Sequence, residues 1–238
     1  MRHHDDVSAA ELPGVDEPLI FWGSLGAAYT QRVAAKWKPG AVGDVAQFTC
    51  SAYFRGLDGI PIANADSVFT TVADLVADPA ASVGPLGEPE RVFVRPDSPL
   101  KPFSGRELAV SDINLDALDH GFYYDDDQLA IVVSTPKQVR REWRLVIADR
   151  QVVASCEYQA SREGIGTEVP EAVTGLAALV AAAEWQPAPL YVVDVGEVSE
   201  KLQVMELNPF SGADLYHCDP GAVVDAVSRV AERLFEAR

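Results

Sequence analysis

The sequence predicts an α+β fold, and three observations lead to that prediction. A short apolar strand at residues 18–21 runs into a Trp-Gly-Ser turn and then into a helical segment at 26–37. Residues 142–159 and 190–208 each contain two apolar runs around a polar turn, which is typical of antiparallel hairpins. The chain closes on an amphipathic helix for which Asp219 supplies the N-cap and Pro220 the first residue.

The remaining elements follow from short apolar runs and the residues that interrupt them. We expect strands around residues 44–50 and 60–63 and a helix over 68–76. The stretch 78–90 is rich in Pro and Gly, which places a domain boundary near residue 85. The predicted parts are a flexible N-terminus at 1–17, an N-terminal α/β lobe at 18–85, and a larger domain at 86–238 made of 86–136 and 137–238.

Beyond the boundary, an arginine interrupts a strand at 91–96, and an apolar strand at 129–134 ends in Ser-Thr-Pro. A helix is expected from about residue 171 to 185. The hairpin over 142–159 turns near Asp149 and places Glu142 and Arg144 on one face, with Trp143 and Leu145 on the other.

Composition narrows the function classes. The 238 residues are 48% hydrophobic and carry a formal net charge of -17, so the chain can bury a substantial core but repels nucleic acid and anionic membranes. The three cysteines have no C-x-x-C spacing, which favours reduced thiols over a disulfide framework or a zinc site. Without an apolar run long enough for a signal peptide or a membrane span, we expect a cytoplasmic protein.

Acidic and amide side chains meet on the second hairpin. In the segment from 204 to 208, alternation places Val204, Glu206 and Asn208 on one face and Met205 on the other, and Pro209 then ends the strand. A turn near Glu200 would bring Asp194 opposite Glu206. Facing carboxylates destabilise a sheet unless a cation joins them, and Mg²⁺ prefers such oxygen ligands. The alternative is a pair of solvated acids on an exposed hairpin.

Basic residues are placed for binding anions on the strand and loop near residue 95. Arg95 leaves its strand just before a loop that carries Lys101, and together they could grip a polyphosphate. The competing interpretation is that both are ordinary solvated cations. Glu142 and Arg144 could likewise form a simple surface salt bridge.

Taken in order, these segments resemble the ATP-grasp fold from about residue 86 to the C-terminus. The segments that carry the resemblance are VFVRP, EWR and ELNPFSGADLY. More narrowly, the chain resembles the phage-type and bacterial clade in which an arginine, here Arg95, replaces the usual first lysine and a displaced lysine, here Lys101, follows. The resemblance implies two α+β lobes with ATP between them, preceded by a short α/β lobe.

The resemblance also implies roles for individual residues. Asp194, Glu206 and Asn208 would bind Mg²⁺, while Arg95 and Lys101 would bind phosphate and act in catalysis. Adenine would stack against the strand ending in Val133 and Ser134. Arg144 would stabilise the transferred phosphate or the acyl-phosphate intermediate, and Glu142 would orient Arg144, bind ribose or do neither.

The implied activity is that of an ATP- and Mg²⁺-dependent carboxylate–amine ligase, which forms an acyl phosphate and then an amide or peptide-like bond. Its expected partners are small-molecule or peptide carboxylates and amines, and a homodimer is compatible with this prediction. Related ligases often carry an arginine two residues before the strand aspartate, where this chain has Val192, so the charge must come from Arg144 or Arg95. A small-molecule kinase and an inactive acidic interaction protein remain as alternatives.

Overall fold

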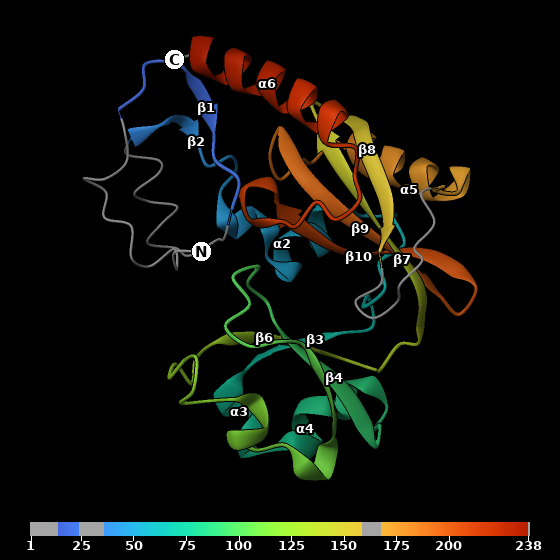
Figure 1. The fold of residues 1–238 in the computed structure, drawn as a ribbon. Helices are drawn as coiled ribbons and strands as arrows, with labels where there is room; N and C mark the ends of the chain where they lie inside the picture. The colour runs from blue at the N-terminus through green and yellow to red at the C-terminus, as the bar shows by residue number, and fades with distance from the viewer. Residues whose placement is uncertain (1–13, 24–35, 159–167, 238) are drawn as a thin grey trace.

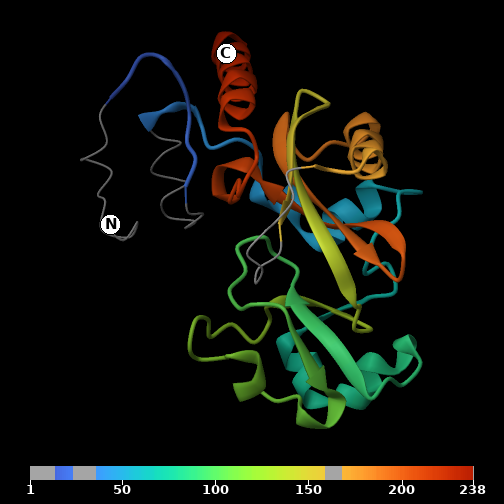
Figure 2. The same ribbon diagram turned by 45° about the vertical axis from the view of Figure 1, so that its right-hand side comes forward.

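The structure is a computed structural model that describes residues 14–23, 36–158 and 168–237. Two four-stranded sheets and a two-stranded pair make up its described strands. Each four-stranded sheet has its own hydrophobic core, and the two bodies are visible one above the other in Figure 1 and, after rotation, in Figure 2. The candidate site lies where these two bodies meet.

The smaller body is an antiparallel sheet in the order β3-β6-β4-β5, with short helices on its outer side (Figure 1). Its strands are β3 (Val68–Thr71), β4 (Arg91–Pro96), β5 (Arg106–Ala109) and β6 (Ala130–Ser134). Helices α3 (Val72–Ala77) and α4 (Pro79–Val83) and the 3₁₀ turns η4 (Gly84–Leu86), η5 (Val110–Asp112) and η6 (Asp116–Leu118) complete it. Val72, Leu75 and Val83 from the helices join Val92 and Val94 of β4 in one core.

The segment before residue 85 differs from its prediction. The helix expected over 68–76 begins as a strand, since Val68–Thr71 pairs with β6, and becomes helical only after Thr71, which accepts a hydrogen bond from the Asp74 amide. The Pro and Gly residues of 78–90 lie at the ends of α4 and η4: Pro79 begins α4, Gly84 begins η4, and Gly87 follows its last residue. Residues 68–85 therefore pack in the same body as β4. The smaller body thus contains residues from both sides of the boundary predicted near residue 85.

The larger body is an antiparallel sheet in the order β10-β9-β7-β8. Its strands are β7 (Val139–Ala148), β8 (Gln151–Tyr158), β9 (Leu190–Val198) and β10 (Lys201–Pro209), and β10 runs into the 3₁₀ turn η7 (Phe210–Gly212). Helices α5 (Glu171–Ala182) and α6 (Pro220–Glu236) pack on this sheet (Figure 2). Both predicted hairpins and the closing helix are confirmed, including the Asp219 cap, whose Oδ1 accepts from the Ala222 amide at 3.0 Å.

The N-terminal segment packs against the larger body. Strand β1 (Pro18–Ile20) pairs in parallel with β2 (Lys38–Gly40), and both contact α6. Most of the helix predicted at 26–37 lies outside the described residues, as do residues 1–13 of the predicted flexible N-terminus. Residues 18–85, predicted as one lobe, thus contribute to both cores.

Two predicted strands in this segment are wrong. Residues 44–50 form the 3₁₀ turn η3 (Val45–Phe48) and the start of helix α2 (Cys50–Gly56), because Asp44 and Thr49 each cap a helical turn through their side chains. Around residues 60–63 only an isolated bridge forms, in which Ile62 pairs with Val204. A short apolar run does not distinguish a buried helix from a strand, which explains both errors.

Asp97 joins the two bodies beside the site. It follows β4, and its carboxylate accepts from the Ser51 amide at 2.8 Å and the Ser51 hydroxyl at 2.7 Å, while its carbonyl accepts from the Cys50 amide. The end of β4 is thereby held against the first turn of α2. No helix in the described part of the chain is both long and apolar enough to cross a bilayer.

Candidate functional site

A β-bulge in β10 sets the geometry of the two acids. Val204 pairs with Val195, the register then shifts, and Glu206 pairs with Asp194. The predicted opposition of Asp194 and Glu206 is confirmed, and Asn208 follows in register on the same face. The prediction that Val204 shares this face is wrong, because Val204 is fully buried in the core, while Met205 lines the cleft beside Glu206.

Glu206 binds two cations that come from the other body. The Arg95 Nη2 lies 2.6 Å from Glu206 Oε2, and the Lys101 Nζ lies 2.8 Å from Oε1. Burial alone would raise the pKa of Glu206, but Arg95 and Lys101 outweigh burial and hold that pKa well below its usual value. Glu206 is therefore a carboxylate, and the two predicted phosphate-binding residues converge on it.

Asp194 is fully buried and binds Arg144 through a bidentate ion pair. The Arg144 Nε and Nη2 donate to Asp194 Oδ1 and Oδ2 at 2.8 and 2.7 Å. Asn208 connects the two acids, since its Nδ2 donates to Asp194 at 3.2 Å and to Glu206 at 2.9 Å. Val192, where related ligases carry an arginine, is buried beside Asn208, and the arginines on this face of the sheet are Arg144 on Asp194 and Arg95 on Glu206.

Glu142 faces the same cleft from β7. Burial raises the pKa of Glu142 to about 7, and the charges of Asp194 and Glu206 add to that shift, which Arg144 and Lys101 oppose. Glu142 lines the cleft, and its cross-strand partner on β9 is Gly196, which has no side chain. A carboxyl group in this position can exchange a proton near neutral pH.

The site residues surround a cleft of about 340 Å³ between the two bodies. Its lining residues are Asn64, Phe93, Arg95, Pro96, Lys101, Ser104, Gly105, Glu142, Met205 and Glu206. Four of the predicted site residues therefore lie in one cleft, and Arg144, Asp194 and Asn208 connect to it through hydrogen bonds. A Cβ at Gly105 would lie 2.6 Å from the Phe93 ring, so glycine allows the loop to pass close to β4.

The two residues predicted to contact adenine, Val133 and Ser134, do not line the cleft themselves. Val133 is buried in the smaller core between β3 and β4, and it does not line the cleft. The Ser134 hydroxyl donates to Asn64 Oδ1 at 3.2 Å, and Asn64 lines the cleft. Asn64 was missed because its segment has no periodic pattern, and only the bridge between Ile62 and Val204 brings it to the site.

The donor set fits Mg²⁺ in its chemistry. Among the described residues, no three Asp, Glu, His or Cys side chains gather closely enough to hold a metal ion by themselves. Glu206 and the amide oxygen of Asn208 nevertheless match how Mg²⁺ is usually bound, through one or two carboxylates with substrate phosphates completing the shell. Asp194 is a ligand of the same kind, but both of its oxygens are paired with Arg144 in this structure. Transfer of Arg95 and Lys101 to those phosphates would free Glu206 for the ion.

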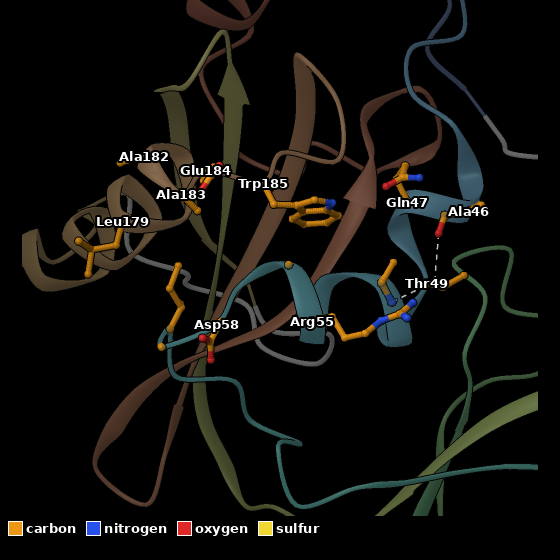
Figure 3. A pocket seen from close by; sticks show the side chains of 14 residues that line it. Ala46, Gln47, Thr49, Arg55, Asp58, Leu179, Ala182, Ala183, Glu184 and Trp185 are labelled. Carbon is orange, nitrogen blue, oxygen red and sulfur yellow. Dashed lines mark hydrogen bonds between the residues drawn. The ribbon is translucent and has the colours of Figure 1, made fainter.

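A second, larger hollow lies elsewhere on the larger body. It has a volume of about 1200 Å³ and runs between η3, α2 and the end of α5, where Trp185 and Arg55 face it (Figure 3). None of the predicted site residues lines it. The cleft between the bodies is therefore the better candidate, since it alone combines the cations with the buried acids.

Comparisons with known proteins identify the family and the fold. Residues 72–226, more than half of the chain, match the family described as "ATP-grasp domain, R2K clade family 2". No curated protein matches.

Solved structures with similar folds share little sequence with this chain. D-cycloserine synthetase DcsG is 17% identical with a TM-score of 0.61, over 87% of this chain and 77% of that one. D-alanine–D-alanine ligase from Bacillus anthracis complexed with ATP is 16% identical with a TM-score of 0.58, over 89% and 75%. ATP-grasp ligase PsnB complexed with precursor peptide PsnA2 and AMPPNP is 16% identical with a TM-score of 0.53, over 87% and 67%. These likenesses establish a shared fold.

Proposed function

The chain belongs to the ATP-grasp domain family of the R2K clade, and from this premise we propose that it is an ATP- and Mg²⁺-dependent carboxylate–amine ligase. One observation carries the proposal: Arg95 and Lys101 of one body both bind Glu206 of the other across a cleft. A Mg²⁺–polyphosphate ligand requires cations for its phosphates and an acid for its metal. Arg95 and Lys101 would supply the first and Glu206 the second once these ion pairs open.

The chain's own residues account for charge and position. The Arg95 guanidinium can bind two phosphate oxygens through its fork, and the Lys101 ammonium adds a compact charge from a loop. Asp194 holds Arg144 in a fixed orientation, so Arg144 can stabilise the phosphoryl group as it reaches a substrate carboxylate. Mg²⁺, held by Glu206, Asn208 and Asp194, would neutralise charge on the phosphates.

Glu142 is suited to accept the proton that an attacking amine must lose. Its raised pKa of about 7 places it near the pH at which a carboxylate becomes an effective base. In this proposal the ligase forms an amide or peptide-like bond and releases ADP and phosphate. Because PsnB has been solved with a precursor peptide, peptides belong among the first substrates to test.

The test is a screen of carboxylates and peptides, each with and without an amine pool, for ADP release that requires both substrates. A carboxylate labelled with ¹⁸O then identifies the reaction. In a ligase, one carboxylate ¹⁸O becomes the oxygen that bridges carbon and phosphorus in the acyl phosphate. When the amine attacks the acyl carbon, this ¹⁸O leaves with the inorganic phosphate. A kinase would yield a phosphorylated product without an amine, and an inactive protein would show no stimulated ADP release.

A further inference from the structure

Two buried cysteines lie behind the candidate site, on segments that flank Arg144. The Cys218 Sγ donates to Cys156 Sγ at 3.4 Å, and both thiols are free. Cys156 sits on β8 directly opposite Arg144 in the strand register. The Cys218 Sγ also lies 3.8 Å from the Arg144 carbonyl oxygen. Both cysteines therefore lie next to Arg144.

Cys218 belongs to a segment that fixes the Arg144 side chain. We define the strap as residues 213–218, which connect η7 to α6. The Asp214 carbonyl accepts from Arg144 Nη1 at 2.7 Å. The Tyr216 ring stacks on Tyr158 at 4.4 Å with planes 9° apart, and the Arg144 guanidinium carbon lies 4.7 and 5.1 Å from the two ring centroids. A displacement of the strap would therefore be transmitted to Arg144.

We propose that Cys156 and Cys218 form a reversible disulfide that ties the strap to β8 and shifts Arg144. A disulfide requires a sulfur–sulfur distance of about 2.05 Å, so the two sulfur atoms must approach by roughly 1.4 Å. That movement draws the strap toward β8, and the Asp214 carbonyl, which binds Arg144 Nη1, moves with the strap. A misplacement of about 1 Å in an active site can reduce catalysis by about a hundredfold.

The oxidant we propose is hydrogen peroxide, which is small enough to reach a buried thiol. The Cys156 thiolate attacks one peroxide oxygen, the O–O bond breaks, and hydroxide leaves and is protonated to water. The Cys218 sulfur then attacks the resulting sulfenic acid, the S–O bond breaks, and a second water leaves with the Cys218 proton. Two thiols lose two electrons and two protons, and one peroxide becomes two waters.

The roles of the two thiols follow from their hydrogen bond. The bond donated by Cys218 lowers the pKa of Cys156 to about 7, while the same contact raises the pKa of Cys218. Cys156 is therefore the attacking thiolate and Cys218 the resolving thiol. Cys50, the third cysteine, has the Tyr53 hydroxyl as its neighbour and serves as an internal control.

The test uses the full chain, reduced and then treated with a few equivalents of hydrogen peroxide. Peptide mapping by mass spectrometry should find a Cys156–Cys218 cross-link with the loss of two hydrogens, and Cys50 should still alkylate. Because the disulfide closes a loop of about sixty residues, oxidation should raise Tm by several degrees. Reduction with dithiothreitol should restore the original Tm. Cys156→Ser and Cys218→Ser should show neither change. Separate overoxidation of Cys156, or cross-links that involve Cys50, would overturn the site.

A second experiment measures whether the disulfide changes catalysis through Arg144, and it rests on the proposed ligase function. ATP turnover of the oxidised protein should fall tenfold or more and recover on reduction, whereas turnover of Cys156→Ser, which lacks the attacking thiolate, should not respond to the same treatment. A cross-linked protein with full turnover would overturn the link to Arg144. If neither redox form turns over ATP, the ligase proposal fails, and the mapping result still decides the disulfide.

Discussion

Asp194 and Glu206 are cross-strand neighbours because Met205 is an extra residue in β10. If the register of Val204 and Val195 simply continued, Met205 would face Asp194, and Glu206 would lie opposite Val193 on the core side. The bulge moves Glu206 to the cleft, where Arg95 and Lys101 bind it. The acidic pair of the candidate site thus depends on Met205 remaining unpaired in the bulge.

Deletion of Met205 should remove the bulge and leave Glu206 opposite Asp194 in a regular ladder, because Glu206 then follows Val204 directly. We expect the variant to keep nucleotide binding and to lose less than about 3 kcal/mol of unfolding free energy, measured by titration and by urea unfolding. Met205→Leu keeps the bulge and should cost less than about 1.5 kcal/mol. A folded deletion variant that no longer binds nucleotide would show that Met205 itself is needed and that the strand register alone does not place Glu206 in the cleft.

Glu206→Gln should abolish productive Mg–ATP turnover and also destabilise the ligand-free protein. The buried Arg95 guanidinium would lose its charged partner, at a cost of about 1–3 kcal/mol. The sequence alone predicts that the two facing acids repel each other, but the two cations on Glu206 reverse this. Glu107→Gln, which breaks an exposed ion pair with Arg91, is the control and should cost under about 1 kcal/mol. Equal losses in the two variants would contradict the account.

Lys101 should exchange its partner when nucleotide binds. Its backbone φ of 47° lies in the left-handed region, so Lys101→Gly removes the ammonium without adding backbone strain. We expect Lys101→Gly to keep the stability of the ligand-free protein while turnover falls about a hundredfold. Hydrogen exchange over residues 97–108 should show Mg–ATP protection in wild type and less in the variant. Equal protection in both proteins would exclude Lys101 from the phosphate site.

Glu142 should give the metal-free protein a distinct pH dependence. Its pKa is about 7 in the folded protein against an ordinary 4.5, so between these values the folded state holds a proton that the unfolded chain has lost. Unfolding free energy should then fall as pH rises from 4.5 to 7, by at most about 3 kcal/mol from this group. The difference between wild type and Glu142→Gln across that range isolates the effect. A difference independent of pH would refute the raised pKa.

Much of the larger body could be predicted because its signals are local. The two hairpins follow from apolar alternation around polar turns, and Ser199 and Glu200 supply the left-handed backbone that a two-residue turn needs. The bulge has no sequence signature in this segment, so the facing acids were predicted with Val204 on the wrong face. The two cations on Glu206 come from the other body, and only the tertiary fold brings them together with it.

The region before residue 85 was harder to predict for a different reason. The Pro and Gly residues between 78 and 90 resemble a linker in composition, yet Pro79 begins α4 beneath the Asp78 cap, and Gly87 ends η4 in a left-handed conformation. Helix α2 was missed because its buried stripe of Cys50, Tyr53 and Leu57 is short and follows other apolar residues. Its contact with Asp97 could be learned only from the structure.

The most direct test of the account is calorimetric titration of Mg–ATP into wild type, Arg95→Lys and Arg91→Lys. Both arginines lie on β4, but the Arg95 side chain is 14% exposed and binds Glu206, whereas Arg91 is 54% exposed and binds Glu107. We predict that Arg95→Lys weakens binding at least tenfold, because a point charge cannot replace a bidentate fork, while Arg91→Lys binds like wild type. Absence of Mg–ATP binding in wild type, or equal binding by all three proteins, would contradict the claim that this cleft binds nucleotide.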